Sequence, residues 1–362
     1  MIHCPQNVGY AIEKLIEVFK VTASISGFRE SQIFFSYTEV IDASDPQVIE
    51  CSFNNPTGFE ALQTLMRDKN ISHLVAFDLN YPEKIIPIIR KNNELKLIAY
   101  WGAGISSINS GFKLLLKRLE WYFRRFKPDR FVFESESMRK TATHGRGIPK
   151  RNTSVVNLGT NTELFIPSEN KNYAYDLFDI PLNRSIVFYS GHMEERKGVH
   201  IIMQAAITLL DMQNFEDVHF VICGNKNGEE EVFLKMLEGK KAKQNVTFAG
   251  YRDDIPQLMQ SSSLGVIAST GWDSFTMSSV EMMSSGLPLI VSDLEGLSET
   301  IEHNVNGYLF TPGDSDALAK YIRNLIGDDK LRYKFSVSSR NRAVNLFSEE
   351  VQAQALSKII MG

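Results

Sequence analysis

The residues with the clearest chemical potential lie in one segment of the sequence, Gly271–Pro288. Asp273 stands before a short polar loop, Ser274–Met277, and Glu281 follows eight residues after Asp273. An apolar run before the loop predicts a buried strand, and a helix is expected after it. Free N–H groups at a helix N-terminus bind phosphate, and a carboxylate beside them accepts hydrogen bonds from sugar or ribose hydroxyls. The segment therefore predicts a site for a phosphorylated sugar or nucleotide.

A structural role explains the same residues when each is taken alone. Ser278 and Glu281 have the spacing of a capping box, in which Glu281 would serve the helix and no ligand. Asp273 fits the position of a turn residue equally well. Both interpretations stay open on these residues by themselves.

A second segment, 185–205, reads as strand, loop and helix and carries cations in its loop. Gly191 and His192 follow the predicted strand, and Arg196 and Lys197 end the loop. A departing nucleoside diphosphate needs cationic stabilisation, which lysine and arginine supply without a metal. The alternative is a solvated charged turn, with His192 as a packed or surface histidine.

The elements that must position these loops follow a regular rhythm. Short continuous apolar runs alternate with amphipathic stretches along most of the chain, and continuous runs are typical of strands covered on both faces. Such alternation predicts parallel sheets built from βαβ units. The predicted strands are 73–78, 96–101, 130–134, 153–157, 185–190, 219–223, 246–249, 264–269 and 289–293.

The chain has 362 residues, enough for two domains that each bury a core. The polar region 166–184, which contains two prolines, interrupts the rhythm and marks a domain boundary. We therefore expect an α/β protein with two Rossmann-like, doubly wound domains, 1–165 and 166–346, that face a central cleft. A C-terminal helix within 347–362 is expected to pack back on the N-terminal domain. Ligands of such sheets bind at the carboxyl ends of the strands.

The segment 271–288 resembles the donor-site motif of retaining glycosyltransferase family 4, whose members have the GT-B fold and use nucleotide sugars. The matching order is an acid, Asp273, seven other residues, Glu281, a helix of small residues, and Gly-x-Pro at 286–288 before a strand. The stretch 295–314 continues the family order. The first acid of the family motif is usually glutamate, so the side chain of Asp273 is one methylene shorter than the resemblance implies.

The resemblance implies a role for each matching residue. Glu281 would hold the donor ribose, Asp273 would approach the donor sugar, and Lys197 matches the family lysine that supplies charge to the diphosphate. His192 stands where the family has an arginine, and Gly9 stands where relatives have a glycine-rich loop. The implied catalytic residues are Asp273, Lys197 and Glu281. The implied donor-binding residues are Gly9, Gly191, His192, Arg196, Lys197, Tyr251 (beside the base), Phe275, Thr276 and Met277 (through their backbone), and Glu281.

The implied reaction moves a sugar from a nucleoside-diphosphate sugar, with UDP-sugars favoured, to a hydroxyl acceptor with retention of anomeric configuration. Residues 1–165 would then be the acceptor side and 166–346 the donor side. The resemblance points to bacterial cell-surface glycan or glycolipid synthesis, with a glycan or lipid-linked acceptor and no metal or other cofactor. Two alternatives stay open: a nucleotide-sugar epimerase of the same fold, and a non-catalytic nucleotide- or glycan-binding protein.

The composition of the chain limits which binding partners and which cellular compartment are expected. The net charge is −4 and the pI is near 6.0, so no nucleic-acid partner is expected. The three cysteines are far apart, which argues against a disulfide framework or a zinc ribbon. We recognise no signal-peptide pattern and no apolar run long enough to span a bilayer, so we expect a cytoplasmic protein. Asp314 and Asp316 spell a DxD motif, but they precede a predicted helix and are interpreted as its cap.

The stretch 113–151 is basic, with twelve Lys and Arg against four Asp and Glu, a net charge of +8. Its start has apolar residues at helical spacing between 112 and 126. The favoured interpretation is a helix packed on the core with a solvated cationic face. The alternative is a surface helix within 112–130 that makes peripheral contact with anionic lipid on the inner face of the membrane.

Overall fold

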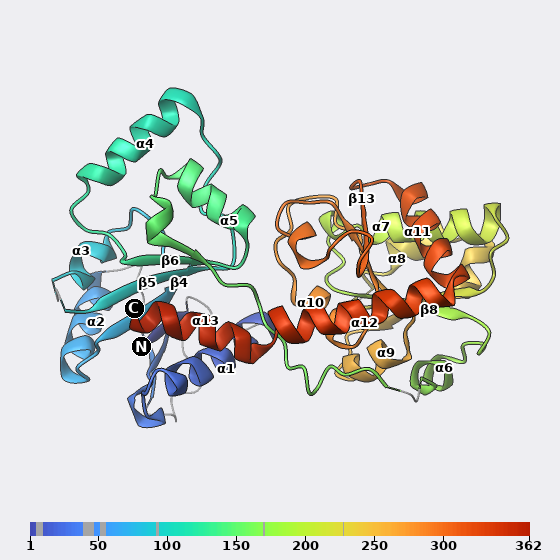
Figure 1. The fold of residues 1–362 in the computed structure, drawn as a ribbon, viewed down its shortest axis with the longest axis horizontal. Coiled ribbons are helices and arrows are strands. Elements are labelled where there is room, and N and C mark those ends of the chain that lie inside the picture. Colours follow the sequence, from blue (N-terminus) through green and yellow to red (C-terminus); the bar gives the residue numbers. More distant parts are fainter. Residues whose placement is uncertain (5–9, 39–46, 51–55, 92–93, 169–170, 227) are drawn as a thin grey trace. The chain divides into compact units, whose positions relative to one another are not determined.

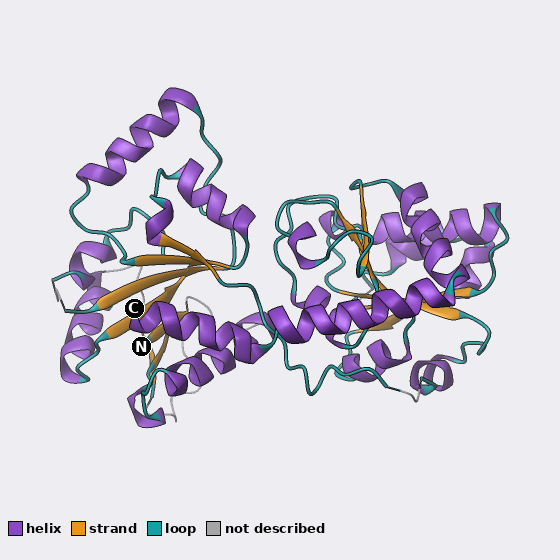
Figure 2. Cartoon of the chain, in the orientation of Figure 1, coloured by secondary structure: helices purple, strands orange, loops and turns teal. Residues whose placement is uncertain are grey.

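The computed structural model describes residues 1–362 except 5–9, 39–46, 51–55, 92–93, 169–170 and 227. Within the described residues the chain divides into two compact units, one formed by 1–157 with 350–362 and the other by 158–349. In each unit a parallel sheet has helices on both of its faces (Figures 1 and 2). The expected α/β, doubly wound class is confirmed.

The first unit has a seven-stranded sheet in the order β3-β2-β1-β4-β5-β6-β7, with every neighbouring pair parallel. Its strands are β1 (Ile2–Cys4), β2 (Phe35–Tyr37), β3 (Val48–Glu50), β4 (His73–Phe77), β5 (Lys96–Trp101), β6 (Arg130–Phe133) and β7 (Thr153–Val155). Its helices are α1 (Tyr10–Ile25), α2 (Pro56–Asp68), α3 (Ile85–Ile89), α4 (Gly111–Phe123), α5 (Glu136–Lys140) and α13 (Glu349–Met361).

The second unit has a six-stranded parallel sheet in the order β10-β9-β8-β11-β12-β13. Its strands are β8 (Ser185–Ser190), β9 (Val218–Cys223), β10 (Val246–Gly250), β11 (Leu264–Ile267), β12 (Leu289–Ser292) and β13 (Gly307–Phe310). Its helices are α6 (Tyr173–Phe178), α7 (Val199–Ile207), α8 (Glu231–Met236), α9 (Ile255–Ser261), α10 (Met277–Ser284), α11 (Ser315–Gly327) and α12 (Asp329–Leu346).

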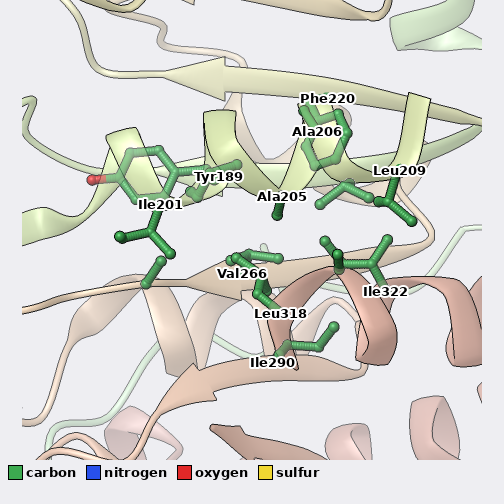
Figure 3. Close-up of a cluster of buried hydrophobic side chains, with 14 of the residues drawn as sticks. Tyr189, Ile201, Ala205, Ala206, Leu209, Phe220, Val266, Ile290, Leu318 and Ile322 are labelled. Carbon is green, nitrogen blue, oxygen red and sulfur yellow. The ribbon is translucent and has the colours of Figure 1, made fainter. Parts of the chain in front are cut away.

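The apolar runs form the strands because both faces of each sheet are covered. All six residues of β9 are buried, and so are the four central residues of β8. On one face of the second sheet, Ile201 and Ala205 of α7 and Leu318 of α11 pack with Val266 and Ile290 from the strands (Figure 3). Burial on both faces accounts for the lack of strict alternation in these sequences. All nine predicted strands are present, whereas β1, β2, β3 and β13 have only three or four residues and were not among the predicted strands.

The division between the units falls earlier than the expected boundary after residue 165. Residues 158–165 belong to the second unit because their backbone is bound there. The N–H of Thr160 donates to the carbonyl of Phe347 at 2.8 Å, and the N–H of Glu349 donates to the carbonyl of Thr160 at 3.1 Å. The guanidinium of Arg340 on α12 donates to the carbonyls of Thr162 at 3.0 Å and Phe165 at 2.9 Å.

The C-terminal helix α13 is part of the first unit. The hydroxyl of Ser26, just after α1, donates to that of Ser357 on α13 at 2.8 Å. The ammonium of Lys96 at the start of β5 donates to the carbonyl of Ile360 at 2.9 Å. Contacts of this kind attach the end of the chain to the N-terminal sheet.

The hydrogen bonds that the Arg340 guanidinium donates to backbone carbonyls, here called the Arg340 clamp, give a stability prediction. The Arg340→Ala variant leaves the carbonyls of Thr162, Phe165 and Ser284 without their charged donor, and the free energy of unfolding should fall by about 3 kcal/mol. Chemical denaturation measures the change, and Arg323→Ala on the exposed side of α11 is the control. Equal stabilities of the two variants would contradict the clamp.

Candidate functional site

The strand order of the second unit creates one place where two loops diverge from neighbouring strands. From β8 the sheet grows through β9 to one side and through β11 to the other, so the order reverses between β8 and β11. In open parallel sheets, ligands bind at this switch point beyond the carboxyl ends of the strands. The loop 191–198 leaves β8 there, and the loop 268–276 leaves β11 beside it.

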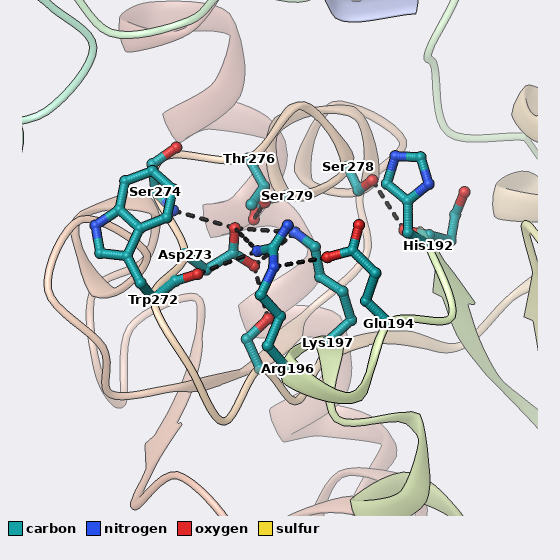
Figure 4. Close-up of polar contacts among 12 residues, drawn as sticks. His192, Glu194, Arg196, Lys197, Trp272, Asp273, Ser274, Thr276, Ser278 and Ser279 are labelled. Atoms are coloured by element: carbon teal, nitrogen blue, oxygen red, sulfur yellow. Dashed lines mark hydrogen bonds and ion pairs between the residues drawn. The ribbon is translucent and has the colours of Figure 1, made fainter. Parts of the chain in front are cut away.

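The two loops are joined by a partly buried ion pair. The ammonium of Lys197 lies 2.9 Å from each carboxylate oxygen of Asp273 (Figure 4). The same carboxylate accepts the hydroxyl of Ser269 at 2.6 Å and the N–H of Ser274 at 3.1 Å. The Asp273 side chain is 6% exposed and that of Lys197 is 16% exposed. These two residues lie in separate segments of the sequence, and the fold brings them into direct contact.

Backbone contacts hold the loops together around this pair. The carbonyl of Arg196 accepts the N–H of Thr270 at 2.8 Å. Gly198 has φ of +72°, and a Cβ placed on it would lie 1.8 Å from the carbonyl oxygen of Ala268. Only glycine combines this left-handed conformation with so close an approach. The position of Lys197 is therefore fixed from both sides, by Asp273 and by the neighbouring glycine.

The guanidinium of Arg196 is directed to its own loop and to the next one. Its Nε lies 2.7 Å from a carboxylate oxygen of Glu194, and one terminal nitrogen donates to the carbonyl of Trp272 at 3.1 Å. The same terminal nitrogen is 3.9 Å from Asp273. Figure 4 shows Arg196 and Lys197 on the same side of the Asp273 carboxylate. The two cations therefore lie beside the switch point.

The N-terminus of α10 faces the same region with its own donors. The N-cap of α10 is Thr276, and its hydroxyl pairs with that of Ser279, so no side chain caps the helix. The Ser278 hydroxyl donates to the carbonyl of Ser190 at 2.9 Å, which ties the helix start to the end of β8. Within the part of the chain that the structure describes, the backbone N–H groups of 275–278 donate to no other group. They remain available to an anion.

The capping-box interpretation of Ser278 and Glu281 is wrong. Because Thr276 is the N-cap, Glu281 is the fifth residue of the helix and cannot close a box with Ser278. Glu281 is 4% exposed, and burying a carboxylate is costly unless it is paired or hydrogen-bonded. The side chain of Phe275 is buried against Phe347 at 5.1 Å between ring centroids, so at this position only the backbone is open to a ligand.

The remaining predicted donor-site residues are more scattered. The imidazole of His192 is exposed, and its carbonyl accepts the Tyr189 hydroxyl at 2.7 Å. Tyr251 follows β10, is 63% exposed and lies under the ammonium of Lys226, 4.3 Å from the ring centroid. Gly191 follows β8 directly and approaches Gly224 beyond β9. Gly9 lies outside the described residues.

The DxD motif is a helix cap, as the sequence indicated. The carboxylate of Asp314 is the N-cap of α11 and accepts the N–H of Ala317 at 2.9 Å. Asp316 accepts the Thr208 hydroxyl at 3.4 Å. Both acids are thus used within the fold.

Helix α4 contradicts the favoured interpretation of the basic stretch. Of its residues only Trp121 is buried. The apolar side chains that were expected to pack on the core are instead exposed: Phe112, Leu115, Leu116, Leu119, Tyr122 and Phe123. Helical spacing predicts one apolar face but does not say what covers it. None of the described helices is long and apolar enough to cross a membrane.

A buried polar cluster at the carboxyl edge of the first sheet was not predicted. Glu134, just after β6, is 5% exposed and accepts the Tyr100 hydroxyl of β5 at 3.1 Å. Burial, helped by the nearby charge of Asp78 after β4, raises the pKa of Glu134 to about 8. The only sequence signal for it is a glutamate at the end of a continuous apolar run, a pattern that predicts no more than the end of a strand.

The C-terminal unit matches a known family. Residues 178–342 fit the family described as glycosyl transferases group 1. The match lies entirely within the second unit and covers both loops of the switch point. Over these residues the chain is similar to glycosyl transferases group 1, which agrees with the resemblance found in the sequence.

Solved structures show the fold of the whole chain. A glycosyltransferase from Rickettsia africae aligns with a TM-score of 0.84 at 18% identity, covering 99% of this chain and 96% of that one. The Anabaena protein HepE in complex with UDP aligns with a TM-score of 0.76 at 19% identity, covering 99% and 98%. The chain therefore shares the fold of these proteins over nearly its whole length, and the expected GT-B fold is confirmed.

The alignments with curated relatives cover only part of each protein. A UDP-Gal:alpha-D-GlcNAc-diphosphoundecaprenol alpha-1,3-galactosyltransferase of Escherichia coli is 26% identical over 196 residues, 54% of this chain and 50% of that protein. A phosphatidyl-myo-inositol mannosyltransferase of Mycobacterium leprae is 28% identical over 180 residues, 49% and 46%. The chain thus spans about half the length of these relatives.

The buried Glu134 gives a pH prediction. Its pKa of about 8 lies above the ordinary value of 4.5, so between these values the folded protein keeps a proton that the unfolded chain releases. The free energy of unfolding should therefore fall as pH rises from 4.5 to 8. Glu134→Gln has no proton to lose, so at pH 8 it should be more stable than the wild type by on the order of 3 kcal/mol.

Denaturant unfolding at pH 5 and pH 8 measures this difference. Glu163→Gln, at an exposed position, is the control and should follow the wild type at both values. Parallel pH dependences of the wild type and Glu134→Gln would show that Glu134 is ionised in the folded protein.

Proposed function

We propose that the protein is a retaining glycosyltransferase of family 4 that moves a sugar from a nucleoside-diphosphate sugar, with UDP as the favoured nucleotide, to a hydroxyl acceptor. The observation that carries the proposal is the cluster at the switch point of the second sheet. It combines the Lys197 ammonium, the free N–H groups of 275–278 and the buried Glu281. Cations and amides stabilise a leaving diphosphate, and a buried carboxylate accepts ribose hydroxyls.

The order of these groups along the site supports a nucleoside diphosphate over a simple phosphate. The amides at the start of α10 and Lys197 supply positive charge at one end of the cluster. Tyr251 presents an exposed ring after β10, on the other side of β8 and β9, where a base can stack. The neighbouring solved structure of HepE holds UDP, which agrees with this choice. The reaction needs no metal in this account, because Lys197 and the amides carry the charge.

Residues that match the donor-site motif should therefore be required for turnover. Lys197→Ala should lower the rate of UDP release from a UDP-sugar by about 100-fold, because one preorganised cation is lost from the leaving group. Glu281→Ala should abolish detectable turnover. The assay follows UDP released by transfer or by slow hydrolysis across a panel of UDP-sugars.

Two exposed residues of the same types serve as controls, Lys320→Ala and Glu238→Ala, and both should keep the wild-type rate. Near-normal turnover of Glu281→Ala would overturn the donor-site assignment. Release of an epimerised UDP-sugar without transfer would identify an epimerase, and binding without turnover in the wild type would identify a non-catalytic protein.

For the acceptor we propose a lipid-linked glycan or glycolipid of bacterial cell-surface synthesis, reached by a protein that stays on the cytoplasmic side of the membrane. Helix α4 is the structural support. Its exposed fractions are 72% for Phe112, 76% for Tyr122 and 78% for Phe123, which is unusual for three large apolar side chains within four turns. The names of the E. coli and M. leprae relatives also mention lipids, diphosphoundecaprenol and phosphatidyl-myo-inositol.

The charges on α4 favour an anionic lipid surface over a protein partner. Lys117 and Arg124 are neutralised by Glu120 on the same helix. Lys113, Arg118 and Arg125 are exposed and form no ion pair within the described residues. Exposed apolar rings beside unpaired cations are the composition of helices that lie in the headgroup region of anionic bilayers.

The purified protein should therefore float with vesicles that contain phosphatidylglycerol at low salt, and less so at high salt or with phosphatidylcholine alone. The double variant Phe112→Ser, Phe123→Ser should lose at least tenfold in vesicle affinity. The control is Leu182→Ser, Tyr333→Ser, which removes equally exposed apolar groups, 72% and 73%, from the second unit. Absence of vesicle binding at low salt, or equal vesicle affinity of both double variants, would contradict a membrane-binding role of α4.

A further inference from the structure

The carboxylate of Asp273 has no remaining capacity to accept hydrogen bonds. Lys197 occupies one position on each oxygen at 2.9 Å, Ser269 a second position on Oδ2, and the Ser274 N–H a second position on Oδ1. A carboxylate offers about four lone-pair positions. A sugar hydroxyl could bind Asp273 only by displacing one of these donors.

The surroundings of Asp273 also keep other groups away. Its side chain is 6% exposed, and its carboxylate contacts Lys197 in the loop after β8 and Ser269 and Ser274 in the loop after β11. The side chain is one methylene shorter than the glutamate that the family resemblance places at this position. A shorter, saturated and buried carboxylate suits an internal contact more than a ligand contact.

Lys197 has the complementary property. Two of its three ammonium hydrogens are directed to Asp273, and the described residues offer Nζ no further partner. The third hydrogen is left for a ligand, and 16% of the side chain is exposed. A lysine side chain loses considerable rotamer entropy when it is held in one place. Because the contact with Asp273 already holds the Lys197 side chain in place, this entropy is lost before any ligand binds.

We propose that Asp273 is a positioning residue, which holds the Lys197 ammonium in place for a diphosphate and does not itself bind the donor sugar. This inference rests on the proposed function, since it assumes that the site takes a nucleoside diphosphate. Binding of the diphosphate and recognition of the donor sugar are then the work of different residues. Asp273 acts on the diphosphate through Lys197, and other groups recognise the sugar.

Calorimetric titration of UDP and of UDP-glucose onto the wild type, Asp273→Asn, Lys197→Met and the double variant tests the proposal. Asp273→Asn should change the Kd of both ligands by the same factor, at least threefold. In the Lys197→Met background that factor should fall to about one, because the substitution acts only through the lysine. Ser269→Ala, which leaves the ion pair in place, should give a smaller change that is again equal for both ligands.

Two results would overturn the proposal. One is a change in Kd for UDP-glucose with none for UDP, which would mean that Asp273 contacts the sugar. The other is a change that persists in the Lys197→Met background or is absent from Asp273→Asn altogether. The variant Asp273→Glu separates the two roles. If Asp273 contacts the sugar, Asp273→Glu should bind UDP-glucose at least as well as the wild type. If Asp273 positions Lys197, the longer side chain should displace the ammonium, and Asp273→Glu should bind both ligands as Asp273→Asn does.

The failure of the proposed function has a different signature. If the wild type binds no UDP, GDP, ADP or sugar derivative of them, the glycosyltransferase proposal falls. The contact itself is then judged from thermal unfolding of the same four proteins. Non-additive shifts in Tm for Lys197→Met and Asp273→Asn support the coupling of the two residues, and additive shifts overturn it.

Discussion

The partly buried contact between Lys197 and Asp273 is the interaction on which the site depends. Removing two charges from water is costly, and the cost is offset only when good geometry and further hydrogen bonds accompany the pair. Ser269 and the Ser274 N–H provide those bonds, and the rigid ends of β8 and β11 provide the geometry. The pair can form only because the strand order brings these two loops together at the switch point.

Much of this architecture follows from local sequence. Continuous apolar runs predict the buried strands, because a strand covered on both faces has no polar side. The loops that carry Lys197 and Asp273 were found as separate cation-bearing and acid-bearing segments. Their direct contact was not predicted, since 76 residues separate them in the chain and no pattern encodes the distance. The N-cap of α10 was also not predicted: it is Thr276 and not Ser278, so Ser278 and Glu281 do not have the positions of a capping box.

Other features are set by tertiary structure alone. The spacing of apolar residues in 112–126 predicts a helix with one apolar face, but whether that face meets a core or a solvent is decided by what the rest of the chain leaves to cover it. For α4 only Trp121 finds a buried place. Similarly, Glu134 has the sequence context of an ordinary strand end, and its raised pKa comes from burial beside Tyr100. The two units thus differ in how far sequence describes them. The second follows a family motif, and the first carries its distinctive groups in places that only packing defines.

If a nucleoside diphosphate binds at the switch point of the second sheet, a crystal structure of the protein with UDP will show it there. We expect diphosphate oxygens within hydrogen-bonding distance of Lys197 Nζ and of the N–H groups of 275–278, a ribose on Glu281, and Asp273 still bound to Lys197. UDP bound elsewhere on the chain, or bound here without contact to Lys197 and Glu281, would contradict this expectation.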